Sequence, residues 1–139
     1  MKNKIIIDSN VILSGLKSKN GYSFKLLKQI PNNKFKVAIS VPLILEYESL
    51  LMSNIKTLGL NKKDINDFIN YICKISEHTK IYYLWRPFLK DPYDDHLLEV
   101  AAASSSKYII TFNIKNFINI EQFGIKVLKP KDFIKILGV

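Results

Sequence analysis

The stretch KIIIDSN, residues 4–10, decides the fold of this 139-residue chain. Three consecutive β-branched isoleucines without polar alternation are typical of a strand buried on both faces at the centre of a parallel sheet. Asp8 follows at the strand's carboxyl end, where ligands bind in open α/β sheets. Ser9 and Asn10 can cap a helix over residues 11–16. Asp8 is therefore either a ligand-binding residue or only a turn or cap residue.

Strands and helices alternate along the rest of the chain. Apolar and β-branched runs predict further strands at residues 34–40, 81–84, 108–110 and 125–128. Helices are expected between them, and those in the region from Pro42 to Ile75 form a helical hairpin that rests against the sheet or projects from it. Because no linker, repeat or low-complexity segment interrupts this order, we expect one α/β domain over residues 1–139.

The chain is strongly basic, with a net charge of +9 and Arg86 as the one arginine among 21 basic residues. Such a charge favours a polyanionic partner through phosphate contacts and counterion release. Lysine acts as a point charge that suits backbone phosphates better than base edges. The alternative is a lysine-rich surface that serves solubility alone.

The sequence predicts a cytoplasmic protein without membrane contact. Its first apolar run covers only residues 5–7, and no apolar stretch approaches the roughly 20 residues of a membrane span. Cys73 lies among isoleucines in a helical pattern, as expected for a small core residue in a reducing compartment.

Acidic residues cluster in this basic chain. Seven of the 12 fall in three short stretches that the predicted topology brings to one edge of the sheet: Asp8, Glu46, Glu48, Asp91, Asp94, Asp95 and Glu99. Carboxylates brought together in this way repel one another unless a cation lies between them. The clustering therefore predicts a metal site.

Residue types alone do not decide which of these acids belong to the metal site. Glu46 and Glu48 flank the apolar stripe of their helix on opposite sides. Glu46 is favoured because it lies nearer the helix start, although both can be solvated flank residues. Asp91, Asp94 and Asp95 precede or begin a helix, where aspartate is favourable as a turn or cap residue. Three acids within five residues exceed what capping requires.

Four stretches carry a family resemblance. They are IIIDSN at residues 5–10, IS at 39–40 followed by Glu46, DPYDDHLLEVA at 91–101 and ITFNIKNF at 110–117. Each motif alone is weak, whereas the ordered set spans nearly the whole chain. Together they resemble the PIN-domain nucleases, in particular the VapC-type toxins of bacterial and archaeal toxin–antitoxin pairs.

The resemblance implies a three-layer α/β/α fold with a central, mainly parallel sheet of about four to five strands and a helical hairpin insertion. It also implies a metal-dependent endoribonuclease that hydrolyses mainly single-stranded RNA as the toxin of such a pair. The implied cofactor is Mg²⁺ or Mn²⁺, as one or two ions. The implied partners are RNA, a cognate antitoxin protein, and further copies of the chain in a homodimer or larger oligomer.

The resemblance also assigns roles to individual residues. The implied catalytic and metal-binding acids are Asp8, Glu46 and Asp95, and the further candidate ligands are Asp94 and Asn113. The residues expected to orient these ligands or a bound water are Ser9, Asn10 and Thr111. Many family members carry an acid at the position of Asn113. An amide there removes one negative charge, which weighs against a tightly bound second ion.

Two other functions remain open. A degenerate PIN domain that only binds nucleic acid or a partner protein would account for Asn113. An aspartyl-phosphate phosphatase also opens with a strand ending in aspartate, but it needs a second acid where this chain has Asn10. Nucleotide binding is disfavoured because neither a glycine-rich fingerprint nor a P-loop occurs. The sequence leaves the RNA target, the cleavage sequence and the choice between Asp94 and Asp95 undecided.

Overall fold

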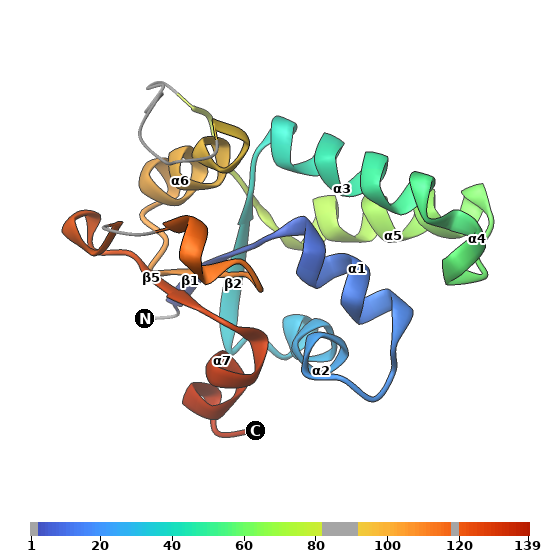
Figure 1. Cartoon of the computed structure of the whole chain (residues 1–139), viewed down its shortest axis with the longest axis horizontal. Helices are drawn as coiled ribbons and strands as arrows, with labels where there is room; N and C mark the ends of the chain where they lie inside the picture. The colour runs from blue at the N-terminus through green and yellow to red at the C-terminus, as the bar shows by residue number, and fades with distance from the viewer. Residues whose placement is uncertain (1–2, 82–91, 118–119) are drawn as a thin grey trace.

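The computed structural model describes residues 3–81, 92–117 and 120–139 (Figure 1). Within them, five parallel strands form one sheet in the order β3-β2-β1-β4-β5. The strands are β1 (Asn3–Ile7), β2 (Phe35–Ile39), β3 (Glu77–His78), β4 (Tyr108–Ile110) and β5 (Lys126–Leu128). The predicted α/β fold with a mainly parallel sheet is confirmed.

Seven α-helices accompany the sheet in the described part of the chain. They are α1 (Ser9–Lys17), α2 (Tyr22–Gln29), α3 (Val41–Ser53), α4 (Ile55–Leu58), α5 (Lys62–Ile75), α6 (Pro92–Ser104) and α7 (Pro130–Leu137). The 3₁₀ turns are η1 (Ile30–Asn32), η2 (Ile114–Phe117) and η3 (Ile120–Phe123). α6 packs on β1 and β2, and α7 packs on β5 and α2. None of the described helices has the length and apolar character needed to cross a membrane.

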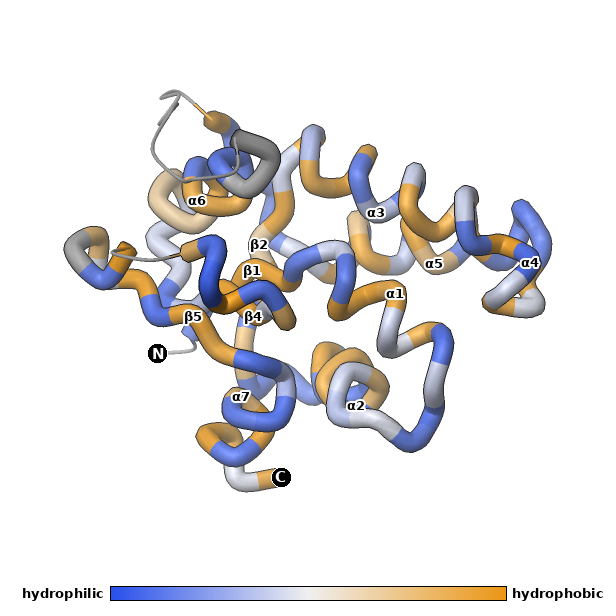
Figure 2. Tube along the Cα trace, in the orientation of Figure 1, coloured by the Kyte–Doolittle hydropathy of each residue, from blue (hydrophilic) through white to orange (hydrophobic). Residues whose placement is uncertain are grey.

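β1 is the central strand, as its sequence predicts. Ile5, Ile6 and Ile7 are each 0% exposed, so both faces of the strand are covered. Ile5 pairs with Val37 of β2 on one side and with Tyr108 of β4 on the other. Figure 2 shows the hydrophobic colouring along β1. The hydrophobic effect thus fixes the strand whose carboxyl end carries Asp8.

The strand order creates a switch point between β1 and β4. From β1 the chain moves outward to β2 and β3, and it then returns to the opposite side of β1 as β4 and β5. Loops leave the strand ends in opposite directions at such a reversal and open a crevice in which ligands bind. Asp8 and Thr111 directly follow β1 and β4 and therefore lie at this switch point.

The predicted helical hairpin is present. α3 and α5 lie side by side and are joined through α4 (Figure 1). The side chain of Asn61 caps α5 by accepting a hydrogen bond from the Asp64 N–H at 2.8 Å, and the Asp64 carboxylate accepts one from the Asn61 N–H at 3.0 Å. The apolar stripe of α5 is buried in the core and consists of Ile65, Ile69 and Ile72.

Two boundaries differ from the prediction. The third strand is Glu77–His78 and lies before the predicted range 81–84. Ile81 does not belong to a strand, and residues 82–84 lie outside the described residues. β3 consists of two exposed polar residues. It is a strand because it pairs with β2, and its sequence has no apolar pattern that would predict it. The N-cap of α1 is Asp8 instead of Ser9 or Asn10, and Asp8 makes no side-chain capping bond. Its carboxylate instead accepts a hydrogen bond from Thr111, which follows β4.

One contact stabilises the start of α3, and another fixes the helix against the end of β1. Ser40 caps the helix by accepting a hydrogen bond from a backbone N–H of the first turn at 3.3 Å. Tyr47, which is 1% exposed, donates a hydrogen bond from its hydroxyl to the backbone carbonyl of Ile7. Burial, reinforced by the carboxylates of Asp8 and Glu46, raises the pKa of Tyr47 well above its usual value. Tyr47 therefore remains a neutral donor.

We expect Tyr47→Phe to lower the free energy of unfolding by about 1 to 3 kcal/mol, because the buried carbonyl of Ile7 loses a donor. Urea denaturation measures the change. The control is Tyr71→Phe, which alters a tyrosine that is 39% exposed and should leave stability within about 0.5 kcal/mol. Equal effects of the two changes would show that the Tyr47 hydroxyl does not hold α3 to β1.

Candidate functional site

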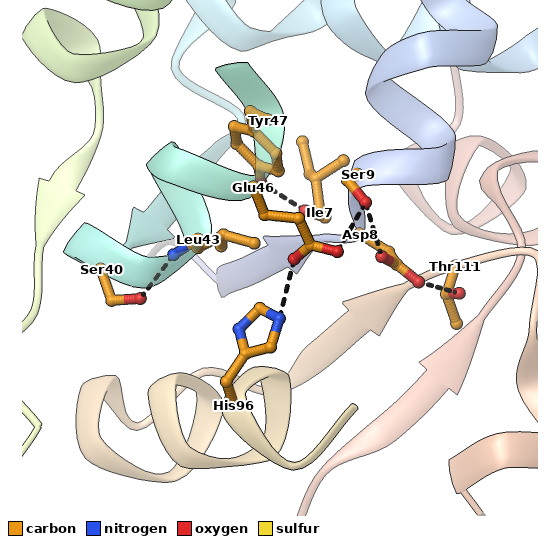
Figure 3. A network of polar contacts seen from close by, with 9 residues as sticks. All are labelled: Ile7, Asp8, Ser9, Ser40, Leu43, Glu46, Tyr47, His96 and Thr111. Carbon is orange, nitrogen blue, oxygen red and sulfur yellow. Dashed lines mark hydrogen bonds and ion pairs between the residues drawn. The ribbon is translucent and has the colours of Figure 1, made fainter. Parts of the chain in front are cut away.

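Three elements bring polar side chains together at the carboxyl edge of the sheet (Figure 3). Asp8 follows β1, Thr111 follows β4, and Glu46 lies on α3. Thr111 donates a hydrogen bond from its hydroxyl to Oδ2 of Asp8 at 2.7 Å. Asp8 is 5% exposed and Thr111 is 0% exposed, so this bond lies inside the protein.

Ser9 connects the two carboxylates. Its Oγ lies 3.0 Å from Oε1 of Glu46 and 3.5 Å from Oδ1 of Asp8 (Figure 3). A serine hydroxyl has one proton to donate, so it cannot satisfy both carboxylates at once. The shorter distance favours Glu46, and the contact with Asp8 is weak. The two acids therefore share one donor.

The environment of Asp8 disfavours its charge. Burial is the main cause of a pKa raised above the usual aspartate value, and the carboxylate of Glu46 raises it further. The hydrogen bond from Thr111, a backbone hydrogen bond from Ser9 and the nearby His96 act in the opposite direction without cancelling these effects. An ionised Asp8 at this position is a carboxylate that a bound cation would stabilise.

The side chain that the sequence analysis missed is His96. Its Nε2 lies 2.7 Å from Oε2 of Glu46, and the two side chains are 12% and 9% exposed (Figure 3). His96 stands within the DPYDDHLLEVA motif, but a single histidine in an amphipathic helix gives no sign of the helix that it faces. This contact between α6 and α3 orients Glu46 toward the site. The periodicity of α3 alone does not show whether Glu46 or Glu48 belongs to the site.

The other predicted residues that the structure describes lie on α6 or in the loop after β4. Asp95 precedes His96 on α6 and is 0% exposed, and Glu99 lies one turn later and is 3% exposed. Asp94 belongs to the first turn of the same helix, whereas Asp91 lies outside the described residues. Asn113 is exposed, and its backbone N–H donates to the hydroxyl of Thr111 at 3.0 Å.

The donor set suits a hard divalent cation. Carboxylate and amide oxygens are the ligands that Mg²⁺ prefers. The oxygens of Asp8 and Glu46 provide such ligands, since one oxygen of each lies within 3.5 Å of the Ser9 hydroxyl. Asn10 lies in the first turn of α1, and its side-chain oxygen is buried without a hydrogen-bond partner. Within the described ranges, no three or more His, Cys, Asp or Glu side chains form a group that could hold a metal. The pair of acids, Asp8 and Glu46, is thus the feature that fits an ion.

We expect Asp8→Asn to raise the melting temperature in EDTA at neutral pH. The folded protein binds the Asp8 proton more tightly than the unfolded chain does, so stability falls as the pH rises above the usual aspartate pKa. The neutral amide avoids this loss. Thermal unfolding measures the effect, and the control Asp132→Asn removes an exposed acid from the first turn of α7. The control should leave the melting temperature unchanged or lower it slightly, and a clear decrease for Asp8→Asn would contradict the prediction.

Comparison with known sequences identifies the family of this chain. No curated protein sequence matches this chain. A sequence model of the PIN domain matches residues 4–115, which contain β1, α3 with Glu46, α6 and β4. Because the match covers most of the sequence and includes the strand ends that form the crevice, the chain belongs to the PIN-domain family, whose members are generally nucleases.

Proposed function

We propose that this protein is a metal-dependent endoribonuclease that hydrolyses phosphodiester bonds in mainly single-stranded RNA. The observation that carries the proposal is the shared Ser9 hydroxyl between two largely buried carboxylates, those of Asp8 and Glu46, in a PIN domain. Two carboxylates that share one donor beside a crevice retain affinity for a cation. The net charge of +9 supports a polyanionic substrate.

In this proposal, Asp8, Glu46 and Asp95 would hold Mg²⁺ or Mn²⁺. Asp94 is the alternative to Asp95, and Asn113 is a further candidate ligand. When bound, the metal supplies neutralisation of the scissile phosphate and activation of the attacking water. The protein's own part is orientation. Thr111 fixes Asp8 through a 2.7 Å hydrogen bond, and Ser9 and His96 fix the two oxygens of Glu46 at 3.0 and 2.7 Å.

The biological role that we propose is that of the toxin in a toxin–antitoxin pair, acting in the cytoplasm and held inactive by an antitoxin protein. The family membership and the proposed RNA cleavage support this role. We also propose that the protein forms a homodimer or larger oligomer through α3. Val41 and Leu45 lie one turn apart on that helix and are 71% and 57% exposed, so one face of α3 presents apolar surface to solvent.

Substitution of the acids tests the catalytic proposal. Asp8→Asn, Glu46→Gln and Asp95→Asn should each lower cleavage of labelled single-stranded RNA in Mg²⁺ or Mn²⁺ by about 100-fold or more. Loss of a group that merely orients a ligand already costs about 10- to 100-fold, and these changes remove the charged ligands themselves. The controls Glu48→Gln and Asp94→Asn lie on the same two helices and should retain substantial activity.

The same assay separates the alternatives. An inactive Asp94→Asn beside an active Asp95→Asn would make Asp94 the third acid. A wild-type protein that binds RNA without cleaving it would identify a degenerate PIN domain. Cleavage that persists unchanged in EDTA would exclude metal dependence. Hydrolysis of a phosphate monoester without cleavage of RNA would favour the phosphatase.

Light scattering over a wide concentration range tests self-association. We expect a particle larger than the 16.1 kDa monomer, and Leu45→Gln should shift it toward the monomer because a polar amide weakens apolar contact. The control Ile136→Gln changes a residue of α7 that is 54% exposed and should leave the particle size unchanged. A monomer at every concentration would overturn the proposed oligomer.

A further inference from the structure

A pocket of about 470 Å³ lies at the loop that follows Thr111, and Asn113 is its one lining residue to which the mechanism proposed above gives a role. It is lined by residues 112–116 and Lys129. The backbone N–H of Asn113 donates to the hydroxyl of Thr111 at 3.0 Å, and that hydroxyl donates to Asp8 at 2.7 Å. One wall of the pocket is therefore joined to a candidate metal ligand through a single threonine.

The lining combines three kinds of chemistry. Phe112 is 44% exposed and presents an aromatic ring to solvent. Lys115 and Lys129 contribute positive charge, and the amides of Asn113 and Asn116 contribute donors and acceptors. None of the lining residues is acidic. An aromatic ring beside lysines and amides suits a nucleotide, since the ring stacks on a base, the lysines attract phosphate and the amides pair with a base edge.

The pocket is built on fixed backbone. Thr111 donates its N–H to the Leu128 carbonyl at 3.0 Å, which continues the pairing of β4 with β5 and places Lys129 beside the loop. The turn η2 is closed by a bond from the Asn116 N–H to the Asn113 carbonyl at 3.0 Å. Phe117, at the end of this turn, is 2% exposed and anchors it in the core. A preformed pocket loses little entropy when a ligand binds.

We propose that the pocket of residues 112–116 and Lys129 binds one unpaired nucleotide of the RNA strand next to the bond that is cleaved. This inference rests on the proposed ribonuclease function and adds a substrate-binding subsite to it. The base stacks on Phe112, and its flanking phosphates contact Lys115 and Lys129. A base inside a duplex has both faces covered by its neighbours, so the pocket selects single-stranded substrate.

Binding of a labelled ten-nucleotide single-stranded RNA in EDTA tests the subsite without metal-dependent cleavage. Phe112→Ala should weaken binding about tenfold, as expected for loss of one stacked base, and Phe112→Trp should restore it. Tyr71→Ala, which removes an aromatic ring that is 39% exposed on α5, should have no effect. An abasic oligomer of equal length and charge should bind Phe112→Ala and wild type equally well.

A second pair of variants tests the charges. Lys115→Gln combined with Lys129→Gln should weaken binding of both the RNA and the abasic oligomer, and it should reduce the salt dependence of binding. Lys62→Gln, at an exposed lysine at the start of α5, is the control and should change neither.

The outcomes separate the subsite from the proposed function. A wild-type protein that cleaves RNA, together with a Phe112→Ala variant that binds RNA as tightly as Tyr71→Ala, would overturn the subsite and leave the ribonuclease intact. Loss of abasic binding in Phe112→Ala would show that the ring does not act by stacking and would also overturn the subsite. A wild-type protein that neither binds nor cleaves RNA would overturn both.

Discussion

The hydrogen bond between Thr111 and Asp8 is the constraint on which the candidate site depends. It joins the residues that directly follow β1 and β4, at the point where the strand order reverses. Both side chains are buried, so water does not compete for the bond. The bond holds an acid in a place where burial and a second acid oppose its ionisation. The fold therefore keeps a carboxylate fixed at some cost to its own stability.

The neighbouring contacts extend this constraint to the helices. Tyr47 ties α3 to the carbonyl just before Asp8, and Ser9 and His96 engage Glu46 on the same helix. The buried polar groups of the site thus belong to α1, α3, α6 and the end of β4. Such a network stabilises one arrangement of its members, because a displaced member leaves a buried partner unsatisfied. Preorganisation of this kind favours the precise placement that phosphoryl chemistry requires.

The sequence predicts elements whose pattern is local. The isoleucines of β1, the alternation of β2 and the Asn61 cap of α5 each carry a signal within a few residues, and the structure confirms all three elements. β3 carries no such signal, because two exposed polar residues become a strand only by pairing with β2. Strand-end residues are predictable for a related reason, since topology alone brings Asp8 and Thr111 together. The contact between Glu46 and His96 depends on how α3 and α6 pack, and no local sequence pattern predicts it.

The distance along the chain between the two bonded residues has a consequence for synthesis. Thr111 follows Asp8 by 103 residues, and β4 must be inserted beside β1 before their bond can form. A nascent chain that has emerged only as far as the helical hairpin can present Asp8, Ser9 and Glu46, but it lacks the strand that completes the crevice. The switch-point topology therefore delays the assembled site until β4 has been synthesised. Under the proposed ribonuclease function, this order of assembly would leave the growing chain unable to cut the message that encodes it.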